Sequence, residues 1–381
     1  MQGNYLICQN RVVVEGQEIG QFVECTVENT RTKLCGTCSV SIPFYSIAAK
    51  SAVAEGKQKA VGKNLNIYRR IDTDALKIKM GARIEVYASY KDNNALGHRF
   101  EECKIFDGYI REIVGGFPTV LKCEDLSFPL RFGTVTKSWF KAVPLKTILN
   151  DIIPIANQAF ADWRAEEGRN LTYDVPTIEV DGESVDFNAP FKTSILTSPY
   201  EIIENIVVRT MKMFASVNAK DGKALLFCGT ARPETSQKTI DLSTAINVIG
   251  RKIVPQNNFF ENFRVVVTYN AQADQTSKYE VGSQNGTTYE LPYQGDNMLE
   301  KDIKQIGDNT LASLKANRNK GTITTLLYPK IELYDYINFT DTIFSELSGG
   351  YAVIGYKLVC NSRGYHQELT VTNKTFLYLA N

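Results

Sequence analysis

The stretch Lys104–Asp125, KIFDGYIREIVGGFPTVLKCED, decides the fold of the chain. Two apolar runs flank the turn sequence Gly-Gly-Phe-Pro. Glycine reaches positive φ without steric cost and proline presets a turn, so the stretch predicts a β-hairpin. The first strand carries Gly108, and the second ends in the acidic pair Glu124 and Asp125. A similar pattern returns near the C-terminus, so the hairpin is informative about architecture.

The same arrangement of turn, strand and hairpin occurs twice in the chain. Gly81 stands ahead of the alternating run ARIEVYASY, and the Lys104–Asp125 hairpin follows it. Asp335 stands ahead of YINFTD, and Tyr351–Asn373 follows as a second hairpin with Gly355 early in its first strand. Few residues are identical, so chance similarity between two antiparallel β units is the alternative to a true repeat. We expect two copies of one small β unit.

Helical spacing replaces the period of two between these β parts. The segment Lys146–Phe160 places isoleucine and leucine on one stripe, and Pro154 is expected to kink or restart this helix. Ser198, Pro199 and Glu201 have the order of an N-cap, a first helical position and an acidic first turn. An α+β region is therefore expected between the β units.

Two further local signals concern a turn and a helix. Asp221-Gly222 separates two apolar runs and predicts the tip of a hairpin. Leu299–Asn317 has apolar residues at near-helical spacing, interrupted by Gly307. We expect this polar and helical segment to be inserted into the second β unit.

Length and composition describe a folded protein of more than one domain. The chain has 381 residues, of which 43% are hydrophobic and 22% are charged, with a formal net charge of +1. These values exclude a disordered or fibrous chain and a general attraction to nucleic acid or anionic membranes. The N-terminus lacks the pattern of a signal peptide, and no window resembles a membrane span. We therefore expect a cytoplasmic location and no membrane insertion.

The eight cysteines are expected to be reduced, because most lie in apolar, strand-like runs. Cys35 and Cys38 form a CxxC motif, but no second ligand pair stands at the spacing of a zinc site. A strand-like run, not a helix, follows the motif, which argues against a redox site. His98 and His366 are isolated, with no nucleophile pattern near either.

Three acidic pairs could be proposed as glycosidase carboxylates: Glu101-Glu102, Glu124-Asp125 and Glu166-Glu167. Adjacent acids on a strand face opposite ways, whereas acid–base catalysis needs two groups that converge across a cleft. The sequence therefore predicts no catalytic residue, no cofactor and no metal.

A lysine-rich segment lies between the first strands. Lys50, Lys57, Lys59 and Lys63 occur among small residues and predict a loop or short helix. A solvated loop is the simpler interpretation, and contact with a neighbouring protein is the functional alternative.

The order of these elements resembles a known family. The first part reads GARIEVYASY, CKIFDGYIREI, TVLKCEDLSFPL, VPLKTILNDII, SPYEIIENIVVRTMKMFASV and KALLFCG, and the C-terminal part reads GTITTLLYPKIELYDYINFTD and YAVIGYKLVCNSRGYHQELTVT. The chain resembles the baseplate or tail hub proteins of tailed bacteriophages, including the phage late control D family. These proteins share a fold with the N-terminal part of type VI secretion spike proteins.

The resemblance implies a β-rich α+β fold with two tail-tube-like antiparallel β-barrels joined by an α+β middle domain. The expected domains are 1–135 and 241–381 for the barrels and 136–240 for the middle domain, with the insertion around 270–320. Five residues become structural marks of turns and barrels: Gly81, Gly108, Asp125, Asp335 and Gly355. The short stretch after the last predicted strand leaves no room in this chain for a fused wall-degrading or fibre domain.

The resemblance also implies a structural function without catalysis. A homotrimer would form a pseudo-sixfold ring between a hexameric tail tube and a threefold spike or tip, and would line the channel for DNA or effectors. Further implied partners are a tape measure protein and baseplate wedge or distal tail proteins, and the location is a virion assembled in the host cytoplasm. The alternatives are a carbohydrate-binding protein or glycosidase with converging carboxylates, and a metal or redox protein that uses Cys35 and Cys38.

Overall fold

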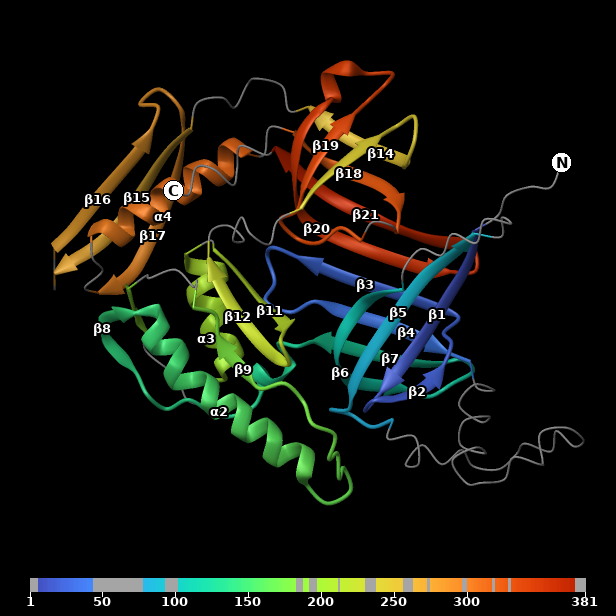
Figure 1. Cartoon of the computed structure of the whole chain (residues 1–381). Coiled ribbons are helices and arrows are strands. Elements are labelled where there is room, and N and C mark those ends of the chain that lie inside the picture. Colours follow the sequence, from blue (N-terminus) through green and yellow to red (C-terminus); the bar gives the residue numbers. More distant parts are fainter. Residues whose placement is uncertain are drawn as a thin grey trace, which may run out of the picture.

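The computed structural model is a β-rich α+β fold built around one large, almost wholly antiparallel sheet (Figure 1). The structure describes residues 6–43, 78–92, 102–182, 188–191, 197–211, 213–229, 238–255, 263–272, 275–296, 300–316, 319–327 and 330–373. Within these residues the large sheet has 13 strands, drawn from both ends of the chain. The predicted β-rich α+β class is confirmed. None of the described helices is long and apolar enough to cross a membrane.

The first group of strands contains the predicted hairpin, formed by β6 and β7. The group consists of β1 (Leu6–Val14), β2 (Gln17–Gly20), β3 (Glu24–Thr30), β4 (Thr37–Ile42), β5 (Arg83–Asp92), β6 (Cys103–Val114) and β7 (Thr119–Asp125). The short 3-10 helix η1 (Phe128–Arg131) follows β7 and leads out of the sheet.

The second group contains the other predicted hairpin, formed by β20 and β21. It consists of β13 (Thr239–Ser243), β14 (Val248–Pro255), β18 (Asn319–Leu326), β19 (Tyr336–Thr340), the 3-10 helix η5 (Ser345–Leu347), β20 (Gly349–Asn361) and β21 (Gly364–Asn373).

The two groups have the same strand order. Hydrogen-bonded neighbours run β3-β4-β7-β6-β5-β1 in the first group and β14-β18-β21-β20-β19-β13 in the second. Corresponding pairs are antiparallel, except that β1 and β5 are antiparallel whereas β13 and β19 are parallel. The expected repeat is therefore present in the topology. We call these groups the first unit and the second unit.

Corresponding strands also carry corresponding irregularities. β6 has a bulge between Ile110 and Glu112, and β20 has one between Val353 and Gly355. Aligned on these bulges, Gly108 corresponds to Tyr351, which differs from the match with Gly355 suggested by the sequence. Both strands carry one bulge at the same place, so the bulges define the register between the units, whereas a single glycine does not.

The sheet does not divide into two separate closed barrels within the described residues. The outer edge of β3 pairs with β20, so the path of neighbouring strands runs open from β14 in one unit to β2 in the other. In Figure 1 the blue strands β3 and β4 accordingly lie beside the red strands β20 and β21. Backbone pairing across the units explains the joined sheet, because an edge strand is stabilised by any partner that satisfies its hydrogen bonds.

The middle region combines helices with two small sheets. Its elements are β8 (Trp139–Pro144), α2 (Leu145–Ala165), β9 (Ile178–Val180), β10 (Asn188–Phe191), α3 (Pro199–Ile203), the π-helix η2 (Glu204–Thr210), β11 (Phe214–Lys220) and β12 (Lys223–Gly229). Ser198 is the predicted N-cap of α3, and the structure adds a capping box, in which the Ser198 and Glu201 side chains each accept the other's backbone N–H. Asp221 and Gly222 form the hairpin tip between β11 and β12.

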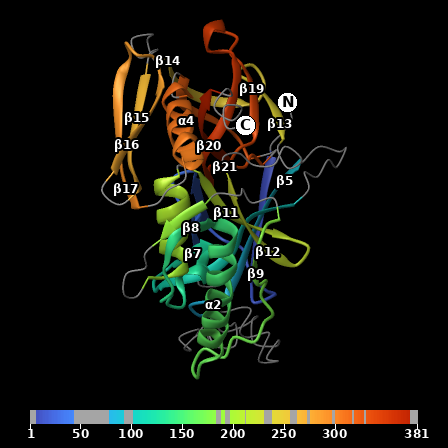
Figure 2. The same cartoon turned by 90° about the vertical axis from the view of Figure 1, so that its left-hand side faces the viewer.

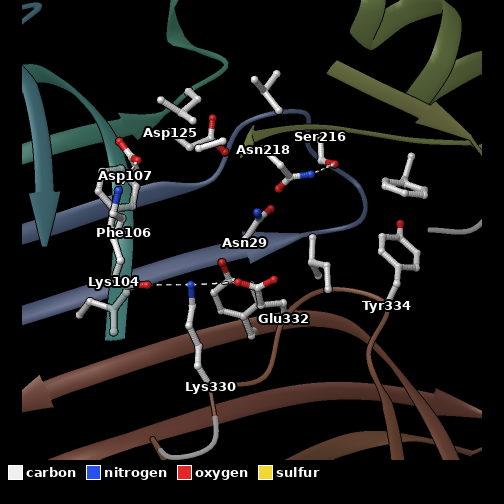
Figure 3. Close-up of a pocket in the computed structure, with 17 residues that line it drawn as sticks. Asn29, Lys104, Phe106, Asp107, Asp125, Ser216, Asn218, Lys330, Glu332 and Tyr334 are labelled. Atoms are coloured by element: carbon white, nitrogen blue, oxygen red, sulfur yellow. Dashed lines mark hydrogen bonds and ion pairs between the residues drawn. The ribbon is translucent and has the colours of Figure 1, made fainter. Parts of the chain in front are cut away.

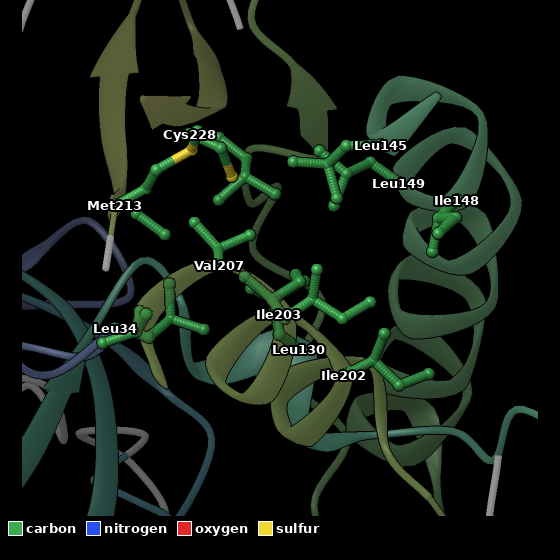
Figure 4. Close-up of a cluster of buried hydrophobic side chains, with 14 of the residues drawn as sticks. Leu34, Leu130, Leu145, Ile148, Leu149, Ile202, Ile203, Val207, Met213 and Cys228 are labelled. Atoms are coloured by element: carbon green, nitrogen blue, oxygen red, sulfur yellow. The ribbon is translucent and has the colours of Figure 1, made fainter. Parts of the chain in front are cut away.

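Pro154 does not restart the helix, which was one of the two predicted outcomes, because α2 runs through it. Pro154 lies on the exposed side of the helix, whereas Ile152, Ile153 and Ala156 are buried. The carbonyl that loses its helical partner can therefore reach solvent, and the buried stripe holds the helix together. Figure 4 shows this stripe, with Ile148 and Leu149 of α2 facing Ile202 and Ile203 of α3 in one apolar cluster.

An inserted unit follows β14. It consists of β15 (Phe263–Gln272), β16 (Gln275–Gly282), β17 (Thr287–Asp296) and α4 (Glu300–Ala316), and Figure 2 shows α4 lying along these strands. Gly307 does not interrupt α4. A Cβ at Gly307 would lie 2.7 Å from the Tyr279 ring of β16, so the glycine permits close packing of helix and sheet.

Candidate functional site: the polar face of the joined sheet

The contact between β3 and β20 joins the two units and carries an ion pair. Six residue pairs form the register, from Gly355 opposite Thr30 to Cys360 opposite Cys25. Lys357 lies opposite Glu28, and their side chains form a salt bridge of 3.0 Å. The hydrogen bond that the Lys357 ammonium donates to the Glu28 carboxylate in this pair raises the pKa of Lys357. Both side chains are about half exposed, so the pair marks a solvent-facing side of the sheet.

One face of the sheet is polar across this contact. Along β3, Thr26 and Glu28 alternate with buried Cys25 and Val27, as expected for a strand with one face on the core. Two rows of cross-strand neighbours run from the second unit into the first without a break at the contact. The first row is Thr324, Glu368, Lys357, Glu28 and Thr37, and the second is His366, Val359, Thr26, Ser39, Lys122 and Glu112.

Charges of both signs alternate on this polar face. Glu112 accepts from Lys122 at 3.1 Å, just as Glu28 does from Lys357. Between these pairs stand uncharged hydroxyl groups, including those of Thr26 and Ser39. A surface of this kind is wetted by water and lacks the concentrated positive charge that binds a phosphate backbone.

The opposite face packs into the core and contains four of the eight cysteines. Cys360, Cys25, Cys38 and Cys123 come from four adjacent strands, and the Sγ atoms of Cys25 and Cys38 are 3.6 Å apart. Burial raises the pKa of the Cys38 and Cys35 thiols, which disfavours the reactive thiolate. Among the described residues, no group of three His, Cys, Asp or Glu could hold a metal ion.

Gly81 and Gly108 lie where the backbone is crowded. Gly81 has a φ of +82°, and a Cβ there would overlap the ring of Trp163. A Cβ at Gly108 would lie 2.7 Å from Cα of Asp125 and closer still to the carbonyl of Glu124. Glycine at these positions permits the turn and the close approach of β6 and β7.

Asp125 and Asp335 hold turns with their carboxylates. Asp125 accepts from the backbone N–H of Gly36 at 2.6 Å and of Ser127 at 2.9 Å, and burial raises the pKa of its carboxyl to about 6. Asp335 is fully buried and accepts from the backbone N–H of Glu332 at 2.8 Å. Gly355 follows the bulge of β20 and lies opposite Thr30 at the contact between the units.

A cavity of about 410 Å³ lies where both units meet β11 of the middle region. Figure 3 shows Asn29, Lys104, Lys330 and Tyr334 around it. The Lys330 ammonium donates to the carbonyl of Lys104 at 3.0 Å and pairs with Glu332 at 3.0 Å. The ion pair therefore lies within the second unit, and the hydrogen bond from Lys330 to Lys104 of β6 joins the two units across the cavity.

Two carboxylates of this region, Asp107 and Glu124, are each held by two cations. In the cavity, Asp107 accepts from Arg83 at 3.1 Å and from Lys104 at 2.9 Å. Nearby, the buried Glu124 is held by Arg111 and Arg131. Carboxylates occupied by cations in this way give no support to the glycosidase alternative.

The residues singled out from the sequence differ in where the structure places them. The five structural marks lie in the two units, and Gly355 alone among them lies directly at the contact. Lys50, Lys57, Lys59 and Lys63 lie outside the described residues, as do His98 and Glu101. The polar face was missed from the sequence, although the alternation of Thr26 and Glu28 with Cys25 and Val27 is its local signal.

Comparison with known proteins finds likeness in structure alone. No protein-family model and no curated protein matches the sequence. A tail protein from Neisseria meningitidis is 11% identical, with 98% of each chain covered and a TM-score of 0.61. A 43 kDa tail protein of prophage MuSo2 from Shewanella oneidensis is 10% identical, with 97% of this chain and 99% of that chain covered and a TM-score of 0.57.

A third similar structure comes from a larger assembly. A chain of the Francisella PdpA–VgrG complex is 8% identical, with 98% of this chain and 53% of that chain covered and a TM-score of 0.52. At such low identities the likeness speaks for the fold. The resemblance inferred from the sequence is confirmed at that level: over nearly its whole length, this chain has the fold of phage tail proteins, which it shares with a chain of a VgrG-containing complex.

Proposed function

We propose that the chain is the structural hub of a phage tail or a related contractile injection system. Three copies form a ring of six similar units, which adapts a hexameric tail tube on one side to a threefold spike or tip on the other. In this proposal each unit takes the place of one tail-tube-like barrel in the ring, although its strands join the other unit in one sheet, and the domains are 1–135, 136–240 and 241–381. The role is mechanical and requires no catalytic group, cofactor or metal.

The joined sheet is the observation that carries this proposal. Two units of the same strand order lie in one sheet, and their polar face continues across the contact between β3 and β20. A head-to-tail contact between similar units closes into a ring when its rotation permits. The polar face then lines the channel, where its alternating charges let DNA or effectors pass without strong binding.

Further partners follow from a hub position. The tape measure protein and baseplate wedge or distal tail proteins are proposed neighbours, and the particle is a virion or injection apparatus assembled in the bacterial cytoplasm. The lysines at 50, 57, 59 and 63 are proposed to contact one neighbouring tail protein. Deletion of residues 48–63 should then impair tail assembly and leave the fold of the purified chain intact.

The test of the proposed function is the assembly state of the full chain. Light scattering and negative-stain imaging of purified protein over a range of concentrations should reveal trimers with a ring outline and a central channel. The resemblance to tail proteins provides the threefold expectation. A chain that stays monomeric at high concentration and in the presence of a matching tail tube protein would refute the hub.

A further inference from the structure

Two strand edges correspond by repeat symmetry to the two halves of the β3–β20 contact. One is the edge of β6 beyond its bulge. Ile110 and Val353 both precede a bulge, and each donates its backbone N–H to the corresponding turn, at Ala82 and Asp335 respectively. Counting onward from the bulges, Val114 of β6 takes the position that Lys357 has in β20.

The other edge is that of β14, which corresponds to β3. Val27 of β3 lies opposite Cys38, which lies opposite Cys123 of β7. Ile253 of β14 lies opposite Gly321, which in turn lies opposite Val371 of β21. Cys123 lies opposite Ile110 and Val371 lies opposite Val353, the two residues that precede the bulges. Ile253 therefore corresponds to Val27. Val254 therefore takes the position of Glu28.

These two edges lack a strand partner within the described residues. β14 pairs there with β18 alone, and Glu112–Val114 of β6 pair with β7 alone. Their equivalents β3 and β20 pair with each other. An open edge of this kind is a template for a strand from another chain.

The chemistry of the two edges is complementary and differs from that of the internal contact. Lys357 and Glu28 form a salt bridge, whereas Val114 and Val254 are apolar and remain 38% and 54% exposed. Apolar side chains on open edges are stabilised when a partner covers them. A second copy that pairs its β14 with β6 would place Val254 beside Val114, in the position of the internal ion pair.

We infer that copies of this chain join by antiparallel pairing of β14 in one copy with the post-bulge edge of β6 in the next, with Val254 opposite Val114. The inference rests on the proposed ring and names its intermolecular contact. The internal contact is ionic at this position and the contact between copies is apolar, so a strand is directed to the correct partner by its side chain.

Cysteine cross-linking of the full-length chain tests this contact. Under mild oxidation, the variant V114C/V254C should give a ladder of disulfide-linked products that ends at a covalent trimer. The matched control V114C/K252C moves one cysteine two residues along the same face, and should give about tenfold less product, because cross-links need Cβ atoms within a few ångströms. The wild type controls for its own cysteines, and K357C/E28C should cross-link within one chain.

The results of this experiment distinguish the proposed β14–β6 contact from the proposed ring. Trimers by light scattering without enhanced cross-linking of V114C/V254C over V114C/K252C would overturn the contact and leave the ring proposal standing. A monomer in every variant would overturn both. As a second measurement, V114K and V254E should each weaken assembly, and the double variant V114K/V254E should restore it by recreating the ion pair of the internal contact.

Discussion

Gly81 and Tyr334 occupy corresponding turns of the two units, just before β5 and β19. We call these turns the first corner and the second corner, and the middle region contacts them through different chemistry. Both residues have positive φ, +82° and +69°. The Gly81 carbonyl accepts from Arg164 of α2 at 2.6 Å, and Arg164 forms a salt bridge of 3.0 Å with Glu15. The Tyr334 ring instead packs on Phe214 of β11, with ring centroids 4.1 Å apart.

The difference shows that the space beside the same backbone turn can be filled either by a side chain of the middle region or by the side chain of the turn residue itself. At the first corner Trp163 of α2 occupies the place of a Cβ, so the chain must have glycine. At the second corner the side chain of Tyr334 itself fills the space. The first contact depends on a buried charge pair, which fails when one partner is lost, and the second depends on apolar packing, which weakens gradually.

Removal of the buried cation should give the largest effect. In R164M, Glu15 stays buried without its partner, so the free energy of unfolding should fall by about 3–5 kcal/mol. Denaturant unfolding followed by circular dichroism measures this loss. The control R169M removes a more exposed ion pair with Glu166 and should cost less than about 1 kcal/mol. Equal losses in both variants would show that charge does not hold the first corner.

A methyl group at the first corner should have the next largest effect. G81A forces an L residue into positive φ and into the Trp163 ring, so a loss of roughly 2–3 kcal/mol is expected in the same unfolding measurement. Gly115 has open space around its position, and G115A should change stability by less than about 1 kcal/mol. Tolerance of G81A would mean that α2 can shift away from the first unit.

The pH dependence of the first unit offers a smaller test. The pKa of Asp125 is about 6 in the folded chain and lower when unfolded, so its stabilising contribution is present at low pH and is lost as pH rises through 6. From pH 7 to pH 5 the wild type should therefore gain about 1 kcal/mol relative to D125N. The exposed Asp162 supplies the control, since D162N should follow the wild type. A constant difference between wild type and D125N would contradict the buried carboxyl.

The smallest effect is expected at the second corner. The Tyr334 hydroxyl is buried and has no hydrogen-bond partner in the described part of the chain. Y334F keeps the ring on Phe214, so stability should stay within about 1 kcal/mol of the wild type or rise. The variant Y334A removes the ring and provides the contrast. A large loss in Y334F would show that polar bonding, and not ring packing, holds this corner.

Local signals in the sequence predicted the single helices, strands and turns better than the pairing of distant strands. The Gly-Gly-Phe-Pro turn, the Ser198 N-cap and the Asp221-Gly222 tip each depend on a few neighbouring residues, so the sequence predicts them directly. The passage of α2 through Pro154 depends on which side of the helix faces solvent, which only the packed structure decides. The pairing of β3 with β20 links residues more than 300 positions apart and leaves no local pattern.

The polar face was predictable strand by strand, but not as one surface. Thr26 and Glu28 alternate with core residues in the sequence, yet their continuation into Lys357 and Glu368 requires the cross-strand register. The bulges at Arg111 and Ile354 shift that register by one residue in each unit. Matching the two strands by glycine alone had aligned Gly108 with Gly355, whereas the bulges align Gly108 with Tyr351.

The contact between β3 and β20 has a consequence for how a ring would assemble. Since this contact lies within one chain, half of the six unit-to-unit contacts in the proposed ring are already made when the chain folds. Only three contacts between separate molecules remain, so the loss of translational freedom is incurred for three bodies instead of six. Assembly should then depend on the third power of chain concentration, and a sparse protein in an infected cell could still complete its ring.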